Sequence, residues 1–332
     1  MKRTIILLAG LFVSYCFEVH GQNPNVGTSG AQFLKIPVGA RAAGMGGAYV
    51  SNTADAAALF WNPAGIVHVK DNEILASYAG LWGGITVNNA AFVHSEEFGS
   101  VGVSMTLLTT GGMEVTTELQ PNGTGQSFDA QDLMLGVSYA RSLTQDFSVG
   151  LSLKFLNQRI WHESASGFAF DVGTQYRLGI GDLTIGMSMT NFGPDMKYDG
   201  QDLDVKYDAN AQSPNNRLSP ATLATDDYPL PLHFQVGVSM TILNTESIKV
   251  QVAADAAHPN DNQERVNVGT EITVLGQLYL RGGYRFGYDT ETGTFGAGVA
   301  LPVSGSTLKF DYSYALYNLL GNIHRISLGL EF

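Results

Sequence analysis

The feature that most constrains this chain is an alternation of apolar with small or polar residues, repeated from Glu73 to the last residue, Phe332. Each repeat is roughly ten residues long, which is the length of a strand that crosses an outer membrane. The last repeat has Ile326, Leu328, Leu330 and Phe332 on one face and Arg325, Ser327, Gly329 and Glu331 on the other. Because successive side chains of a strand point to opposite faces, this period of two separates them into two environments.

About fourteen such segments follow one another without a helical pattern between them. They cover residues 73–80, 85–94, 100–117, 130–142, 147–161, 167–176, 182–192, 232–242, 248–257, 264–274, 278–288, 294–303, 306–315 and 323–332. Strands cross a membrane only as a closed barrel, because lipid cannot satisfy the backbone groups of an open edge. We therefore predict an all-β transmembrane barrel of about 14 antiparallel strands, surrounded by outer-membrane lipid of a Gram-negative cell.

The connections between the predicted strands alternate in length. Those after even-numbered segments are short, whereas those at 118–129 and 193–231, after odd-numbered segments, are long. Because outer-membrane barrels have short periplasmic turns and longer external loops, we expect both termini in the periplasm. The insertion at 193–231 is rich in Asp, Asn, Pro and Ser, and it is interpreted either as a flexible external loop or as a binding lid.

Residues 1–21 are predicted to be a secretory signal peptide. Lys2 and Arg3 precede a short apolar run, and cleavage is expected before Gln22. Cys16 is the only cysteine and lies within this segment, and the bulky Tyr15 before it disfavours the alternative of a lipoprotein. A mature chain without cysteine would have neither a disulfide nor a thiol nucleophile.

Residues 22–72 lack the strand pattern and are predicted to be a separate segment ahead of the barrel at 73–332. The stretch 40–58 is rich in small residues, and Asp55 is a candidate N-cap for a short helix that runs to Phe60. A periplasmic segment that precedes a closed barrel can bury its apolar side chains in the lumen. We therefore expect this N-terminal segment to be a plug.

The pattern of charged residues indicates a structural role for them rather than a catalytic one. A net charge of −12 without basic clusters predicts no nucleic-acid partner. The sequence contains no zinc, nucleophile-elbow or phosphate-loop pattern, so we expect no enzymatic activity, no catalytic residue, no metal and no cofactor. Charges expected in the lumen are Lys154, Asp171, Asp255, Arg281, Arg285, Lys309, Asp311 and Arg325, and Glu271 and Arg265 are interpreted in the same way. Because buried charges must be paired, we interpret them as a salt-bridge network that holds the plug.

Five residues of the plug are candidates for gating contacts: Arg41, Asp55, Phe60, Trp61 and Asn62. Arg41 is the only cation and Asp55 the only acid between positions 40 and 66. We expect them to pair with each other or with opposite charges of the lumen, and a role in gating is the alternative. Phe60 and Trp61 would contact a small hydrophobic molecule if one passes through the barrel.

Two motifs carry a family resemblance. The stretch from Gly30 to Val50, followed by the stretch from Asp55 to Ile66, resembles the PorV/PorQ family of outer-membrane proteins of the Bacteroidetes. The element Asn62-Pro63-Ala64-Gly65 also recurs in the wider FadL-like superfamily of barrels. The resemblance covers essentially the mature chain, although the barrel half is recognisable only by its pattern.

The resemblance implies a part in the type IX secretion system. PorV-like members bind the C-terminal signal domain of secreted cargo beside the translocon, and PorQ-like members belong to the surface-attachment complex. The implied partners are therefore translocon or attachment-complex proteins and the C-terminal domains of cargo. FadL-like barrels instead take up hydrophobic small molecules, and the sequence leaves these alternatives open.

Overall fold

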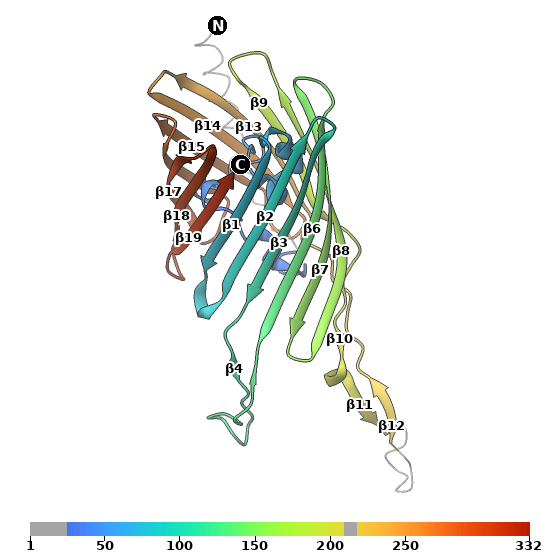
Figure 1. The fold of residues 1–332 in the computed structure, drawn as a ribbon. Coiled ribbons are helices and arrows are strands. Elements are labelled where there is room, and N and C mark those ends of the chain that lie inside the picture. Colours follow the sequence, from blue (N-terminus) through green and yellow to red (C-terminus); the bar gives the residue numbers. More distant parts are fainter. Residues whose placement is uncertain (1–24, 209–217) are drawn as a thin grey trace.

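The computed structural model describes residues 25–208 and 218–332. The predicted signal peptide, residues 1–21, lies outside this described part. Fourteen long strands, β1–β3, β6–β9 and β13–β19, form one antiparallel sheet that closes on itself (Figure 1). The predicted barrel and its strand number are therefore confirmed.

The strands follow one another around the barrel in chain order. Their bounds are β1 (Asn72–Gly80), β2 (Thr86–Glu96), β3 (Gly99–Thr109), β6 (Ala130–Ser142), β7 (Phe147–Ile160), β8 (Glu163–Arg177), β9 (Thr184–Phe192), β13 (His233–Asn244), β14 (Ile248–Pro259), β15 (Arg265–Val274), β16 (Leu278–Phe286), β17 (Glu291–Val303), β18 (Ser306–Tyr317) and β19 (Ile323–Glu331). The first strand pairs with the last, from Glu73 with Glu331 to Gly80 with His324. Because each wall strand is paired on both sides, lipid meets no open edge.

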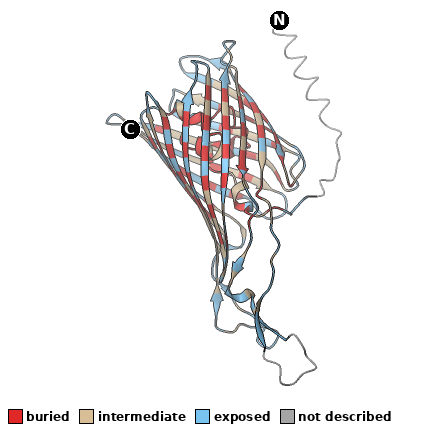
Figure 2. Ribbon diagram, turned by 90° about the vertical axis from the view of Figure 1, so that its right-hand side faces the viewer, coloured by how far each residue is buried: buried red, intermediate tan, exposed pale blue. Residues whose placement is uncertain are grey.

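The wall is apolar outside and polar inside. On β7, Leu151 and Leu153 are 58% and 47% exposed, whereas Ser152 between them is 4% exposed. Val238 and Ser239 on β13 show the same contrast, and buried and exposed positions alternate along the strands in Figure 2. The outward faces predicted from the alternation are therefore those that face lipid. No helix within residues 25–208 and 218–332 is long and apolar enough to cross a membrane.

The two rims of the barrel carry different connections. At one, here called the turn rim, strands are joined by short turns such as 245–247 and 304–305. The C-terminal residue Phe332 lies at this rim, where its backbone pairs with that of Asn72 (Figure 1). The opposite rim, here called the loop rim, carries the two long insertions, one between β3 and β6 and one between β9 and β13.

Two ribbons project from the loop rim beyond the barrel (Figures 1 and 2). The shorter one pairs β4 (Met113–Glu114) with β5 (Ser127–Phe128). The longer one pairs β11 (Asp204–Tyr207) with β12 (Ser219–Thr222). Where it leaves the barrel, β10 (Asp199–Gly200) pairs with β8, and the short helix η4 (Gln201–Leu203) follows. The described part of the 193–231 insertion thus contains short paired strands, which the interpretation as a flexible loop did not anticipate.

The predicted strand 100–117 is wrong at its end, because β3 stops at Thr109. Its partner β6 begins at Ala130, and Gln131 is the residue that pairs with Thr109. Thr110 still donates its N–H to Ala130 O at 3.0 Å, but the residues after it have no wall strand beside them. The exposed Gly111 and Gly112 lead the chain out into the ribbon of β4 instead.

Residues 25–71 are here called the inner segment, and most of them, from Ala31 to Val69, lie inside the barrel (Figure 1). Their helical elements are η1 (Gln32–Lys35), α2 (Ala40–Gly44), α3 (Ala58–Trp61) and η2 (Pro63–His68), and the short turn η3 (Trp82–Gly84) lies between β1 and β2. The helix expected from Asp55 begins only at Ala58, because Asp55 Oδ1 accepts the N–H of Ala57 at 3.0 Å in a turn before it. The apolar core of the molecule consists of clusters of buried residues between this segment and the wall.

Candidate functional site

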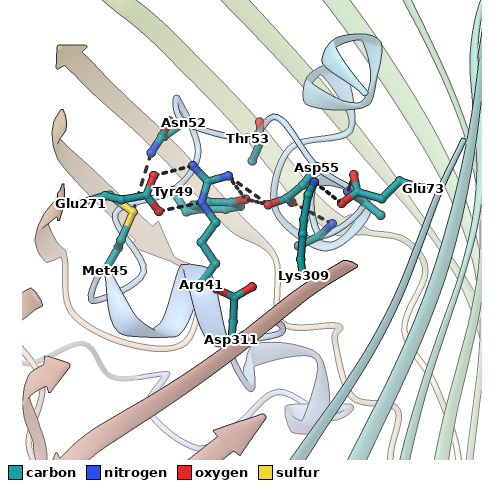
Figure 3. A network of polar contacts seen from close by, with 12 residues as sticks. Arg41, Met45, Tyr49, Asn52, Thr53, Asp55, Glu73, Glu271, Lys309 and Asp311 are labelled. Carbon is teal, nitrogen blue, oxygen red and sulfur yellow. Dashed lines mark hydrogen bonds and ion pairs between the residues drawn. The ribbon is translucent and has the colours of Figure 1, made fainter. Parts of the chain in front are cut away.

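Arg41 on α2 joins the inner segment to the wall. Its Nε and Nη2 donate to the two carboxylate oxygens of Glu271 on β15, both at 2.9 Å. Its Nη1 donates to Asp55 Oδ2 at 3.0 Å, and the hydroxyl of Tyr49 donates to the same oxygen at 2.6 Å. Figure 3 shows the guanidinium between the two acids. Arg41 and Asp55 therefore pair with each other, and Arg41 also pairs with an acid of the lumen.

Glu271 also binds a second arginine. Arg281 on β16 donates from Nε to Glu271 Oε2 at 2.6 Å and from Nη1 to Asp311 Oδ1 on β18 at 2.5 Å. The connected group, here called the Arg41 network, contains Arg41, Tyr49, Asp55, Glu271, Arg281 and Asp311. A carboxylate that accepts a bidentate arginine is held in direction as well as in distance, so this network fixes α2 against three wall strands.

A second ion cluster lies close to the first one (Figure 3). Lys309 Nζ on β18 contacts Glu73 at 2.9 Å and Glu331 at 3.0 Å. Glu73 Oε2 also accepts the N–H of Ala56 at 3.0 Å. Because Glu73 and Glu331 come from the first and last strands, this lysine lies at the seam where the barrel closes, and Glu73 connects that seam to the inner segment.

Asp255 on β14 is not part of an ion pair with any described residue. Its Oδ2 accepts the backbone N–H groups of Tyr49 at 2.7 Å and Val50 at 2.9 Å, and the side-chain amide of Gln235 at 2.9 Å. The expectation that this acid belongs to a salt-bridge network is therefore wrong. Backbone donors of the inner segment bind one oxygen of this carboxylate in place of a cation.

Asn62 holds the second half of the inner segment. It is fully buried, and its Nδ2 donates to Val50 O at 2.8 Å and to Thr174 O on β8 at 3.0 Å. Its Oδ1 accepts the N–H of Ala64 at 3.1 Å and so caps η2, which begins at Pro63. The amide thus connects two parts of the inner segment to the wall without any charge.

Close backbone contact completes the docking. A Cβ on Gly283 of β16 would occupy the space of Gly46 N and Met45 C, and a Cβ on Gly44 would come within 3.1 Å of Gly296 Cα. Gly46 has a φ of +70°, which favours glycine. The glycines of the wall therefore allow the backbone of the inner segment to approach it directly.

Lys154 and Asp171 form a separate pair on the neighbouring strands β7 and β8. Lys154 Nζ lies 2.6 Å from Asp171 Oδ2 and 3.0 Å from the side-chain oxygen of Asn191. Asp171 Oδ1 accepts the N–H of Asn191 at 2.8 Å. Both side chains are buried, and they contact none of the members of the Arg41 network.

A cluster of arginines lies nearer the loop rim. Arg285 on β16 donates from Nε to Gly46 O at 2.9 Å and from Nη1 to Glu291 on β17. Arg325 on β19 is 1% exposed and forms no ion pair with a described residue. The predicted lumen charges therefore lie in several separate groups rather than in one network. Within the described residues, no three His, Cys, Asp or Glu side chains gather as a metal site.

Phe60 and Trp61 line a cavity of about 290 Å³ between the inner segment and the loop-rim half of the wall. Trp61 Nε1 donates to Val38 O at 2.9 Å, and its ring meets Tyr49 edge-on with centroids 6.0 Å apart. Phe60 packs against buried residues of two apolar clusters. Both rings are half-buried and line this cavity.

The start of the inner segment is fixed at the loop rim by Asp261, which lies between β14 and β15. Lys35 Nζ contacts its two oxygens at 2.8 and 2.7 Å, and Gln32 Nε2 donates to Oδ2 at 2.9 Å. The hydroxyl of Ser29 donates to the same oxygen. Burial acts to raise the pKa of Asp261, but the hydrogen bonds from Lys35, Ser29 and Gln32 outweigh it, and the net pKa lies below the ordinary value.

Several partners of the candidate residues were not singled out from the sequence. Glu73 and Glu291 occupy lumen-facing positions of their strands, so the alternation that placed the other lumen charges could have identified them. Tyr49 and Asp261 come from irregular segments and Lys35 from the single turn η1, where no periodicity indicates which way a side chain points.

Comparison with known families decides where this barrel belongs. A family model described as type IX secretion system protein PorV matches residues 19–220, which is more than half of the 332 residues. The chain belongs to the PorV family. This PorV-family barrel is accordingly an outer-membrane protein associated with type IX secretion. Among curated proteins, no relative matches the sequence.

Solved structures with the same fold are FadL-like barrels. The toluene transporter TodX of Pseudomonas putida has a TM-score of 0.57 and 13% identity over 88% of this chain and 96% of that one. The monoaromatic hydrocarbon channel CymD has a TM-score of 0.56 and 12% identity over 89% and 96%. A FadL homologue of Pseudomonas aeruginosa has a TM-score of 0.54 and 11% identity over 88% and 97%. At these identities the PorV-family barrel shares their fold.

Proposed function

We propose that this protein is a non-enzymatic accessory barrel of type IX secretion that binds the C-terminal domain of secreted cargo at its loop rim. In this proposal the turn rim and both termini face the periplasm, and the two ribbons face outward. Residues 1–21 are the signal peptide, residues 22–72 the plug and residues 73–332 the barrel. The observation that carries the proposal is the pair of ribbons on a PorV-family barrel.

The β11–β12 ribbon is suited to binding another β-rich chain. Its two strands pair only with each other within the described residues, so their outer edges keep backbone donors and acceptors free. Tyr207 and Leu223 beside these edges are 59% and 54% exposed. A strand of a β-rich cargo domain could add to such an edge, with main-chain hydrogen bonds for affinity and exposed apolar side chains for contact area.

The inner segment supports binding at the rim rather than passage through the barrel. Arg41 attaches its first half to Glu271 of the wall, and Asn62 attaches its second half to β8. Breaking these contacts would leave buried charges and amides unpaired, which costs several kcal/mol for each charge. In this proposal the inner segment closes the lumen, which leaves the ribbons and the outer wall as the surfaces for partners, and we assign the translocon or attachment-complex proteins to the wall.

The test is copurification from crosslinked outer membranes in mild detergent, followed by mass spectrometry. The complete protein is expected to recover a very large barrel together with secreted proteins that share a C-terminal β-domain. A variant with the β11–β12 ribbon replaced by a short Gly-Ser linker should keep the large barrel and lose the cargo. A matched replacement of the turn-rim residues 179–182 should lose neither. Cargo recovered equally without the ribbon would contradict the proposal.

A second candidate function is passage of small hydrophobic molecules. It is favoured by one observation, the cavity beside Phe60 and Trp61 in a barrel with the fold of hydrocarbon channels. It requires the inner segment to open a continuous path. Uptake of labelled toluene into proteoliposomes containing the protein would support it, provided that Trp61→Arg abolishes the uptake. Uptake no faster than in protein-free vesicles would remove this candidate.

A further inference from the structure

The cavity at the loop-rim side of the inner segment has two unlike walls. One wall belongs to the inner segment and is mostly apolar, with Leu34, Ile36, Phe60 and Trp61 among its residues. The opposite wall comes from several barrel strands, and the part of it formed by β15–β19 contains Arg265, Arg285 and Arg325. The volume, about 290 Å³, is near the lower end of the range for pockets that bind small molecules.

Cations outnumber acids around this cavity. Five cationic side chains line it: Lys35, Lys154, Arg265, Arg285 and Arg325. Three of them are paired with an acid, Lys35 with Asp261, Lys154 with Asp171 and Arg285 with Glu291. Subtracting these three pairs from five leaves two positive charges without a described counter-ion, on Arg265 and Arg325.

Of these two arginines, Arg325 is the more deeply buried. It is 1% exposed, and although its side chain interacts with that of Tyr317, its Nε and Nη1 find no hydrogen-bond partner among the described residues. Arg265 Nε is likewise buried without a partner, while its guanidinium lies 4.3 Å from the ring centroid of Tyr288. A buried guanidinium with unused donors is costly, and arginine in a fixed fork is the side chain that best matches a carboxylate or phosphate.

We infer that this cavity is a binding site for a small molecule that carries a carboxylate or phosphate group on an apolar body. The oxyanion contacts Arg325 and Arg265, beside the Arg285–Glu291 pair, and the apolar body lies against Phe60 and Trp61. The inference does not depend on the proposed binding of cargo, because it concerns the lumen and not the ribbons.

The two unpaired positive charges distinguish this site from one that binds an uncharged hydrocarbon. A neutral aromatic molecule would cover the apolar wall but would leave the donors of Arg325 unpaired and further desolvated. An oxyanion satisfies those donors and neutralises part of the excess charge in the same step. The site is therefore expected to discriminate between an acid and its neutral amide of nearly the same shape.

The two cavity tryptophans provide the measurement. Trp61 and Trp82 both line the cavity, and Trp161, the third of the three tryptophans, does not. In the Trp161→Phe background, the purified full-length protein in detergent would be titrated with phenylacetate, phenyl phosphate, phenylacetamide and inorganic phosphate. We expect a saturable fluorescence change with one or both aromatic anions. Phenylacetamide should bind at least about tenfold more weakly, because it lacks the anionic oxygen that accepts a charge-assisted hydrogen bond from the arginines.

Variants locate the binding site. Arg325→Gln should weaken binding of the aromatic anion by about tenfold or more, and Arg265→Gln should weaken it in the same direction. Arg159→Gln is the matched control, because Arg159 is an exposed arginine paired with Asp129 away from the cavity, and it should change nothing. Phenyl phosphate binding more tightly than phenylacetate would identify the phosphate as the source of the oxyanion.

Four results would overturn the inference. These are equal binding of phenylacetate and phenylacetamide, no saturable change with either aromatic anion, binding of inorganic phosphate as tight as that of phenyl phosphate, and unchanged affinity in a folded Arg325→Gln protein. If that variant does not fold, Arg265→Gln decides, because Arg265 is only half-buried at the cavity margin, and unchanged affinity there would have the same consequence.

Discussion

Two groups of buried and half-buried arginines lie in one lumen and differ in how their charges are balanced. In the Arg41 network, two arginines meet three acids, and Arg41 and Arg281 share the carboxylate of Glu271. Around the loop-rim cavity, Arg265 and Arg325 have no described acid partner. Both groups are shielded by the same wall, so burial alone does not explain the difference.

The difference assigns a structural role to the Arg41 network and a ligand-binding role to the arginines of the cavity. A network whose donors and acceptors satisfy one another holds its elements together and has nothing left for a ligand. A group with spare donors gains by acquiring a partner, and a nearby cavity provides room for it. The Arg41 network therefore holds the inner segment against the wall, whereas the cavity arginines have donors available for a ligand.

The sharpest test of this contrast is to replace one arginine of each group by methionine, Arg41 in the Arg41 network and Arg325 at the cavity. The larger effect is expected for Arg41→Met. We expect it to lower the free energy of unfolding by about 3 to 5 kcal/mol, because it leaves Asp55 and part of Glu271 buried without their cation. The measurement is a urea titration of the protein in lipid vesicles, followed by tryptophan fluorescence. An effect below about 1 kcal/mol would mean that the network contributes little to docking.

Close packing on the same side of the inner segment provides the next test, because Gly282 and Gly283 are neighbours in β16. Gly283→Ala should cost about 1 to 3 kcal/mol, since its Cβ would overlap Gly46 and Met45. Gly282→Ala is the matched control, because no atom lies within 4 Å of its added Cβ. Equal unfolding curves for the two variants would show that the inner segment can move away from the wall at little cost.

Arg325→Met completes the contrast with Arg41→Met. It removes a buried charge that has no acid partner, so stability should be unchanged or should rise by up to about 2 kcal/mol. The same urea titration measures this effect. A loss as large as that of Arg41→Met would show that Arg325 is already satisfied by the protein, and the distinction between the two groups would then fail.

The smallest expected effect is a loosening of the start of the inner segment in acid. The hydrogen bonds from Lys35, Ser29 and Gln32 keep the pKa of Asp261 below its ordinary value, so their stabilisation is fully present above the pKa of the unfolded carboxyl. It is lost as the pH falls through the lowered pKa of the folded state. Amide hydrogen exchange in residues 29–35 should therefore increase in acid relative to 38–55. Asp261→Asn should remove this pH dependence, and its persistence would assign the effect elsewhere.

Much of the barrel was predictable from the alternation of residues. Leu151, Ser152 and Leu153 already indicate which side of β7 meets lipid, and the family resemblance arises from the stretch Gly30–Val50. The end of β3 was not predictable, because a strand ends where its partner β6 begins, and that is a property of the pair. The pairing of Arg41 with Asp55 was among the expected alternatives, but its third partner, Glu271, lies 230 positions away in the chain.

The sequence by itself determined a closed barrel, its lipid-facing side and the acids and bases of its lumen, because a period of two along one strand needs no knowledge of the other strands. Only the tertiary structure decided which of those charges meet. Asp255 received backbone amides instead of a cation, and Arg325 was left with unused donors. The reason is physical: a charge is satisfied within about 3 Å, and distances on that scale between separate segments are set by the curvature of the wall and the path of the inner segment.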